Sequence, residues 1–168
     1  MVNQLLKEFF SPKRLYFVCG KVYQDMHYAN RIVHWYTQHR LPVIPVNPKG
    51  GEIALSVDSV SRRVAGDTRL PIARTIKEGL DNYKGKKDID GISVSFVTPP
   101  PVTLSILKEL KDVGTPVISV WFQPGSWNTE CVDYATADLK IPEGNVINDC
   151  ILINGHSNYV KSELVADL

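Results

Sequence analysis

The chain has few cysteines, no long apolar run and almost no net charge. Cys19, Cys131 and Cys150 stand far apart among 168 residues and lack the CxxC spacing of zinc sites and dithiol redox centres. No stretch reaches the roughly 18 apolar residues of a membrane span, and the first residues lack the pattern of a signal peptide. A net charge of +1 gives no field that would attract nucleic acid or an anionic membrane. We therefore expect a cytoplasmic protein with reduced cysteines that binds neither nucleic acid nor membranes.

Patterns that carry catalysis or bind metal are also missing. His27, His34 and His39 are spaced by seven and five residues, unlike the pair in HExxH, and His156 stands alone in a polar tail. No Ser-His-Asp order, paired carboxylates or glycine-flanked serine stands out. The sequence therefore indicates a binding site more than a reaction, with no catalytic residue and no metal.

What is present is the composition of one ordinary globular domain. Apolar residues make up 43% and charged residues 22%, and the 11 glycines and 11 prolines are spread along the chain. A chain of this length suits a single core, so we predict one domain over residues 1–168. Short apolar runs alternate with helical patterns, which indicates βαβ crossovers. The expected fold is three-layer α/β, with a parallel sheet of about five strands covered by helices on both faces.

Local patterns give the expected elements. Apolar runs predict strands at 15–19, 43–46, 91–97, 117–122 and 146–149. Helical spacing predicts helices at 5–10, 28–39, 102–110 and 127–139, with Pro101 in the first turn of the third and Ser126 as N-cap of the fourth. Apolar residues between Leu70 and Leu80 suggest a further helix, and residues 85–88 suggest a solvated turn.

In such a sheet, ligands bind beyond the carboxyl ends of the strands. The second strand ends in a proline, a lysine and two glycines, where nicotinamide-binding domains usually carry an acid for the ribose. A lysine there suits a ligand with several phosphates, and coenzyme A is one. Four loops follow the first four strands, and they supply the candidate cofactor-binding residues: Gly20, Lys21 and Val22; Asn47, Pro48, Lys49 and Gly50; Thr98, Pro99 and Pro100; and Gln123, Pro124 and Gly125.

These loops, in this order, resemble the CoA-binding protein family, whose small Rossmann-like domains are related to the N-terminal domain of the succinyl-CoA ligase alpha subunit. The resemblance extends over about residues 5–153. Its most specific parts are the segments 43–51, 121–125 and 149–151, with a proline loop at 98–101. It implies a Rossmann-like fold and CoA or an acyl-CoA as ligand. It also implies that the first two loops hold the phosphates, while the last two border the adenosine and pantetheine.

Two departures from the family pattern stand beside this resemblance. Many members have a small hydroxyl-bearing turn after the first strand, where this chain has Cys19-Gly20-Lys21, so Lys21 would replace a hydroxyl with a charge. Residues 56–87 form a longer stretch than in compact members, and we assign it no function.

Three hypotheses follow for function. The first is a CoA-binding protein that takes a small-molecule nucleotide and has no catalytic machinery of its own. The second is a nicotinamide-dependent oxidoreductase, which the missing GxGxxG and the missing acid disfavour. The third is a CoA-ligase-like enzyme whose active site is completed by a partner subunit. Small sheets with exposed edges can also pair, which makes a homodimer an open alternative.

Overall fold

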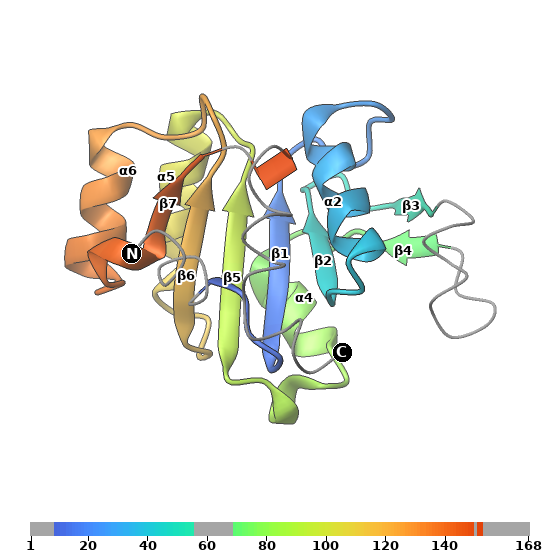
Figure 1. Cartoon of the computed structure of the whole chain (residues 1–168), viewed down its shortest axis with the longest axis horizontal. Coiled ribbons are helices and arrows are strands. Elements are labelled where there is room, and N and C mark those ends of the chain that lie inside the picture. The colour runs from blue at the N-terminus through green and yellow to red at the C-terminus, as the bar shows by residue number, and fades with distance from the viewer. Residues whose placement is uncertain (1–8, 56–68, 150, 153–168) are drawn as a thin grey trace.

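The computed structural model describes residues 9–55, 69–149 and 151–152. Strands and helices alternate along most of this part of the chain (Figure 1). The strands are β1 (Arg14–Cys19), β2 (Val43–Val46), β3 (Glu52–Ala54), β4 (Arg69–Pro71), β5 (Gly91–Phe96), β6 (Val117–Phe122) and β7 (Val146–Asn148). The helices are α2 (Tyr28–Gln38), α4 (Ile76–Asn82), α5 (Pro100–Leu110) and α6 (Thr129–Asp133). No helix in these residues is long and apolar enough to cross a membrane.

Five strands form one parallel sheet in the order β2-β1-β5-β6-β7. All residues of the central strands β1 and β5 are buried, as expected for parallel strands covered on both faces. Alternate residues of β1 enter the two cores: Tyr16 and Val18 pack on one face, and Leu15 and Phe17 on the other. The five predicted strands and the parallel arrangement are therefore confirmed.

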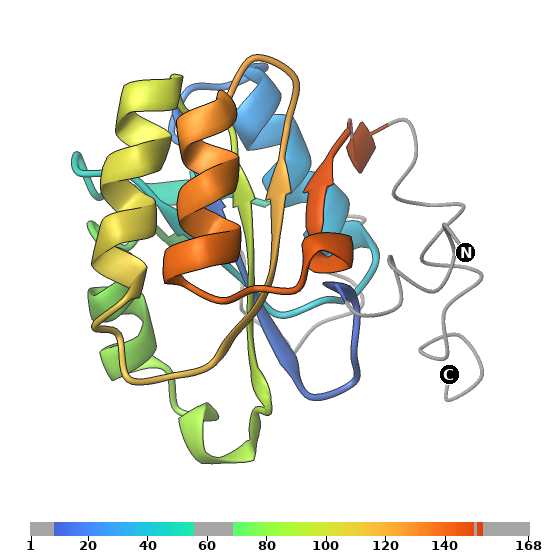
Figure 2. The same ribbon diagram turned by 90° about the vertical axis from the view of Figure 1, so that its left-hand side faces the viewer.

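The helices cover both faces of this sheet. Helix α2 lies on one face, and α4, α5 and α6 lie on the other (Figure 2). The chain passes from β1 to its neighbour β2 through α2, and from β5 to its neighbour β6 through α5. The winding direction thus reverses between β1 and β5. This is a three-layer α/β Rossmann-like fold, and its ligand crevice is expected where β1 and β5 end.

The segment between β2 and β5 differs from the sequence prediction. Residues 69–71 form β4, which pairs with β3 as an antiparallel hairpin, and Ala73 forms a parallel bridge with Val46 at the edge of the main sheet. Helix α4 begins at Ile76, where the Thr75 side chain caps it by accepting from the Glu78 backbone N–H. The predicted helix therefore starts later than Leu70, because the backbone of residues 72 and 73 is used in pairing with β2 and Gly51. Residues 56–68 of the longer stretch lie outside the described part.

The helix after β6 also begins later than predicted. Its N-cap is Asn128, whose side chain accepts from the Cys131 backbone N–H, and α6 starts at Thr129. The Ser126 hydroxyl instead donates to the Gln123 carbonyl at 2.7 Å and closes the turn before the helix. Helix α6 continues as a π-helical turn at Tyr134–Asp138. The correction moves the cap by two residues because Ser126 is used in the turn.

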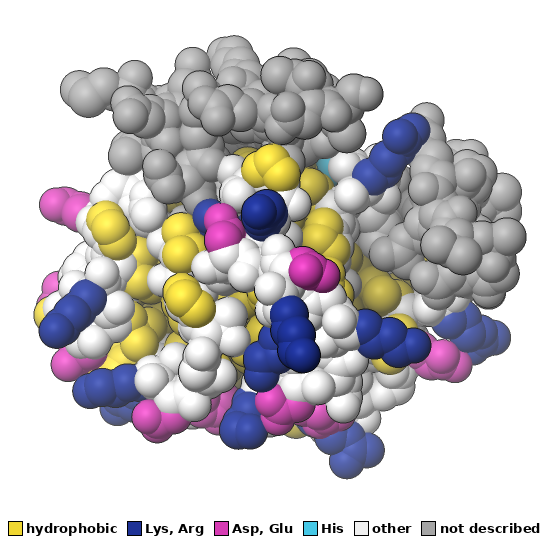
Figure 3. Space-filling view, turned by 90° about the horizontal axis from the view of Figure 1, so that it is seen from below, with side chains coloured by type: hydrophobic (Ala, Val, Ile, Leu, Met, Phe, Trp, Pro, Cys, Tyr) yellow, Lys and Arg dark blue, Asp and Glu magenta, His cyan; other side chains and the backbone are white. Residues whose placement is uncertain are grey.

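Other sequence predictions are met or lie outside the described residues. Residues 86–88 form an exposed 3₁₀ turn, close to the predicted solvated turn. Most of the predicted helix 5–10, together with Cys150 and His156, falls outside the described part. On the face seen from below, at the amino-terminal ends of the strands, lysines and arginines are intermixed with acids (Figure 3).

Candidate functional site

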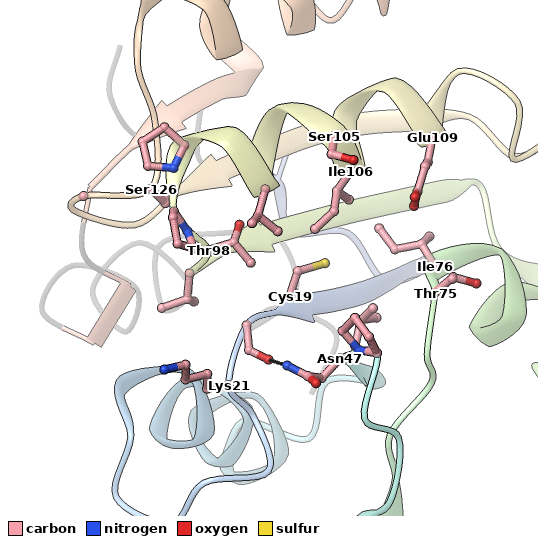
Figure 4. Close-up of a pocket in the computed structure, with 18 of the residues that line it drawn as sticks. Cys19, Lys21, Asn47, Thr75, Ile76, Thr98, Ser105, Ile106, Glu109 and Ser126 are labelled. Atoms are coloured by element: carbon pink, nitrogen blue, oxygen red, sulfur yellow. Dashed lines mark hydrogen bonds between the residues drawn. The ribbon is translucent and has the colours of Figure 1, made fainter.

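A cavity of about 870 Å³ opens at the carboxyl ends of β1, β2 and β5. It lies at the winding reversal, where the fold predicts a ligand. Nine of the thirteen predicted site residues line it: Gly20, Lys21, Asn47, Pro48, Thr98, Pro99, Pro100, Pro124 and Gly125. The four loops predicted from the sequence thus meet around one cavity (Figure 4).

Gly20 allows the first loop to pass close to β5 and α2. Its φ is 157°, and a Cβ at this position would lie 3.1 Å from both Ala29 Cβ and Val97 Cβ. A side chain at this position would crowd Ala29 of α2 and Val97, the residue after β5, and would adopt a backbone angle that residues other than glycine rarely take. The backbone angle and the close packing therefore both favour glycine here, and the backbone after it borders the cavity.

Asn47 joins the loops after β1 and β2. Its Nδ2 donates to the Gly20 carbonyl at 2.7 Å, and its Oδ1 accepts from the Lys49 backbone N–H at 2.9 Å (Figure 4 shows the first bond). Both ends of the amide are thus bonded within the protein. Asn47 lines the cavity, and its side chain holds the two loops in register.

Four predicted residues do not line the cavity. Val22 is fully buried, and its carbonyl accepts from Asn30 Nδ2 at 2.8 Å. Gln123 is also fully buried, and its Oε1 accepts from the Ile151 backbone N–H at 2.9 Å. Its Nε2 has no hydrogen-bond partner among the described residues. The remaining two are Lys49 and Gly50 in the loop after β2.

The lysine of that loop is turned toward Tyr23. The Lys49 ammonium lies 4.5 Å from the centre of the Tyr23 ring, a cation–π contact. Arg74, which the sequence analysis did not single out, lines the cavity instead. It crosses over Gly50, since its Nε lies 3.1 Å from the position a Cβ would take there. With Lys21, the cavity therefore has two cationic side chains among its described lining residues.

One face of α5 was also missed. Val102, Ser105, Ile106 and Glu109 line the cavity, and their spacing of i, i+3, i+4 and i+7 places them on one side of the helix. The buried side of α5 carries Thr103, Leu107 and Leu110. The sequence could have indicated that α5 has one face toward the core and another toward a ligand, because the polar Ser105 and Glu109 do not belong to the row of buried residues.

Two further groups line the cavity between its loops. Burial raises the pKa of the Cys19 thiol far above its ordinary value, and the negative charge of Glu109 acts in the same direction. Cys19 is therefore a neutral thiol on the cavity wall. His27 is the N-cap of α2, and its Nδ1 accepts from the Ala29 backbone N–H at 3.1 Å. No group of three or more metal-ligating side chains occurs among the described residues.

Residues 14–156 match the family described as the CoA binding domain. The chain belongs to this family. The match includes all four rim loops and every residue of the cavity, so the resemblance predicted from the sequence is confirmed. A search of curated proteins gave no match.

Solved structures resemble this CoA binding domain over most of its length. A conserved hypothetical protein from Pyrococcus furiosus is 26% identical, with a TM-score of 0.53, and the match covers 83% of this chain and 97% of that one. A protein from Thermus thermophilus is 18% identical with a TM-score of 0.64, and the match covers 94% and 99% of the two chains. A hypothetical protein from Pyrococcus horikoshii is 16% identical with a TM-score of 0.63, and it covers 95% and 92%. The last two likenesses show the fold alone.

Proposed function

We propose that the protein binds CoA or an acyl-CoA in the cavity at the carboxyl rim and carries out no reaction by itself. The observation that carries this proposal is the meeting of two cations, Lys21 and Arg74, with an apolar cavity of about 870 Å³ in a CoA binding domain. Ligand pockets of small molecules fall in the range of roughly 300–1,000 Å³. The volume, the charge and the family therefore agree.

The phosphates of the ligand would bind at the side where the loops after β1 and β2 meet. Lys21 lies at one end of the cavity (Figure 4), and the N-terminus of α2 begins beside His27, which lines the same wall. Helix N-termini and cations both favour phosphate oxygens. Arg74, beside the loop after β2, is placed for a second phosphate such as the 3′-phosphate, and Lys49 would add charge from outside the cavity.

The proline loop and the loop after β6 would border the rest of the ligand. The Thr98 hydroxyl lies 2.6 Å from the Thr103 hydroxyl, and the Pro99 carbonyl accepts from the Thr103 backbone N–H. These bonds fasten the loop to the first turn of α5. Pro99, Pro100 and Pro124 then present rigid apolar surface to the cavity.

Two side chains of the cavity support binding without catalysis, namely the neutral Cys19 thiol and the Asn47 amide that is bonded at both ends. Cys19 is held as a neutral thiol, so it is a poor nucleophile. Asn47 stands where an oxidoreductase would carry a ribose-binding acid, and both ends of its amide are bonded within the protein. These observations favour a CoA-binding protein over a nicotinamide-dependent enzyme.

Thermal unfolding with CoA, dephospho-CoA and NAD in parallel tests this proposal. A ligand at about 100 times its dissociation constant stabilises the folded protein by about 2.7 kcal/mol, which should raise Tm by roughly 5–10 °C for a chain of this size. We expect that shift with CoA, a smaller one with dephospho-CoA and none with NAD. A shift with NAD alone would replace the proposal with the oxidoreductase, and no shift with any of the three would refute ligand binding of this kind.

A further inference from the structure

The cavity has a distinct end between α4 and α5. Ile76 of α4 and Ile106 of α5 lie on its two sides, and Cys19 of β1 lies between the two helices (Figure 4). Because the Cys19 thiol is neutral, the three side chains that line this end, those of Cys19, Ile76 and Ile106, carry no charge. A space with apolar groups on two opposite sides suits a flat, uncharged ring. Glu109 lies at the far end of this space, away from Lys21 (Figure 4).

Glu109 is the one carboxylate among the described residues that line the cavity. Glu109 forms no ion pair and no side-chain hydrogen bond with another described residue, so its oxygens are available to a ligand. The other charged lining groups, Lys21 and Arg74, are cationic. A ligand with several phosphates is attracted to those cations and repelled by Glu109. A nucleotide in this cavity would therefore be favoured with its phosphates at the cations and an uncharged, hydrogen-bond-donating group at Glu109.

We propose that Glu109 selects the base of the nucleotide, accepting a hydrogen bond from the 6-amino group of an adenine held between Ile76 and Ile106. This inference rests on the proposed function and extends it to the specificity of the same cavity. The base and the 3′-phosphate are both attached to the ribose, and Arg74 precedes Ile76 by two residues in the cavity wall, so a 3′-phosphate at Arg74 would place the base beside Ile76. The pantetheine arm leaves from the far side of the pyrophosphate.

The donors and acceptors of the two bases explain why Glu109 would distinguish adenine from hypoxanthine. An ionised carboxylate can only accept, and the amino group of adenine donates. Hypoxanthine presents a carbonyl oxygen at the same position and carries its donor at the neighbouring N1–H, so a carboxylate that faces the 6-position meets an acceptor instead of a donor. A glutamine can accept from an amino group or donate to a carbonyl, so it would serve both bases. Substituting Glu109 by glutamine should therefore remove discrimination and retain binding.

The test measures the affinities of CoA and of its hypoxanthine analogue by isothermal titration calorimetry. We expect the unsubstituted protein to bind CoA about five- to tenfold more tightly, the range of one net hydrogen bond. Glu109→Gln should bring the ratio to about one, and Glu109→Ala should do the same. Glu143→Gln is the matched control, because it removes the same charge from an exposed residue before β7, outside the cavity. It should leave the ratio unchanged.

Equal affinity for the two bases in the unsubstituted protein would refute this inference, as would a preference that persists in Glu109→Gln. Parallel titrations with ADP and IDP separate it from the proposed function. If CoA does not bind but ADP is preferred over IDP, and Glu109→Gln removes that preference, the base selection stands and the CoA proposal fails. If CoA binds and the base makes no difference, only the base selection fails. Absence of binding by all four ligands would refute both.

Discussion

At the residue scale, the two basic side chains near the end of β2 differ in what surrounds them. Lys49 lies over the Tyr23 ring, and leaving that contact would cost about 0.5–1 kcal/mol at an exposed position. Arg74 already lines the cavity and crosses Gly50. Its guanidinium can also bind a phosphate through two parallel hydrogen bonds. We therefore expect Arg74 to contribute more to ligand affinity than the lysine that the sequence singled out.

Substituting Arg74 by alanine should weaken CoA binding roughly tenfold or more, because a hydrogen bond to a charged group contributes about 1.5–3 kcal/mol. The loss should be smaller for dephospho-CoA, which lacks the 3′-phosphate. Lys49→Ala is the matched control, since it removes the same charge from the adjoining loop, and we expect it to cause a smaller loss. Isothermal titration calorimetry of both variants with both ligands measures these differences. Equal losses in the two variants would contradict the placement of Arg74.

At the element scale, α4 shows how close packing overrides helix propensity. Gly79 is buried against the sheet, and a Cβ there would lie 2.9 Å from Phe17 Cε1 and 3.0 Å from Ile44 Cγ2. A glycine inside an exposed helix normally costs about 0.5–1 kcal/mol relative to alanine. Here the absence of a side chain lets α4 approach β1 and β2, and it positions Ile76 at the cavity.

Gly79→Ala should therefore lower the free energy of unfolding by about 1–2 kcal/mol, since overpacking costs about 1–3 kcal/mol and exceeds the gain in propensity. Urea denaturation measures the change. Asn82→Ala, at the exposed end of the same helix, serves as the control and should stay within about 0.5 kcal/mol of the unsubstituted protein. An unchanged or increased stability in Gly79→Ala would mean that α4 can move away from the sheet at little cost.

The segment that leads into α4 is the part of the fold that sequence patterns did not predict correctly. Apolar residues from Leu70 to Leu80 suggested one helix, but the chain divides into β4, a bridge at Ala73 and then α4. The bridge depends on the free edge of β2, which is distant in sequence. A local apolar pattern cannot report such a pairing, because it carries no information about an edge elsewhere in the chain. Arg74 was missed for this reason, since its position follows from that bridge.

At the scale of the whole molecule, the stability of the fold should depend on pH through His34. Partial burial lowers the pKa of this histidine, and the nearby charge of Asp25 opposes the shift. Its Nδ1 is buried without a hydrogen-bond partner among the described residues. The folded state therefore favours the neutral ring, whereas the unfolded chain titrates near its ordinary pKa of about 6.5.

Between the two pKa values the unfolded chain binds more protons, so the contribution of His34 to stability is present above about pH 6.5 and is lost as the pH falls through the lowered value. Urea denaturation at a series of pH values from about 7.5 to 5 should show this loss. His34→Gln should reduce the slope, and Asp25→Asn should steepen it by lowering the pKa of His34 further. A slope that is the same in all three proteins would show that other groups control the dependence.

Much of the architecture followed from local patterns. The parallel sheet, its five strands and the four loops at one rim could be predicted because buried strands are apolar along their whole length and the turns that follow them are rich in glycine and proline. The match of residues 14–156 to the CoA binding domain family confirms the resemblance carried by those loops. Nine of the predicted site residues meet around the cavity for the same reason.

The amino-acid sequence by itself determined the class of the fold, the order of the five main strands along the chain and the family, because each depends on residues that are close together in the chain. Only the tertiary structure decided which side chains face the cavity. Arg74 reaches it through the pairing of Ala73 with β2, Glu109 through the packing of α5, and Lys49 is turned to Tyr23 instead. These placements depend on contacts between segments far apart in sequence, which local patterns do not encode.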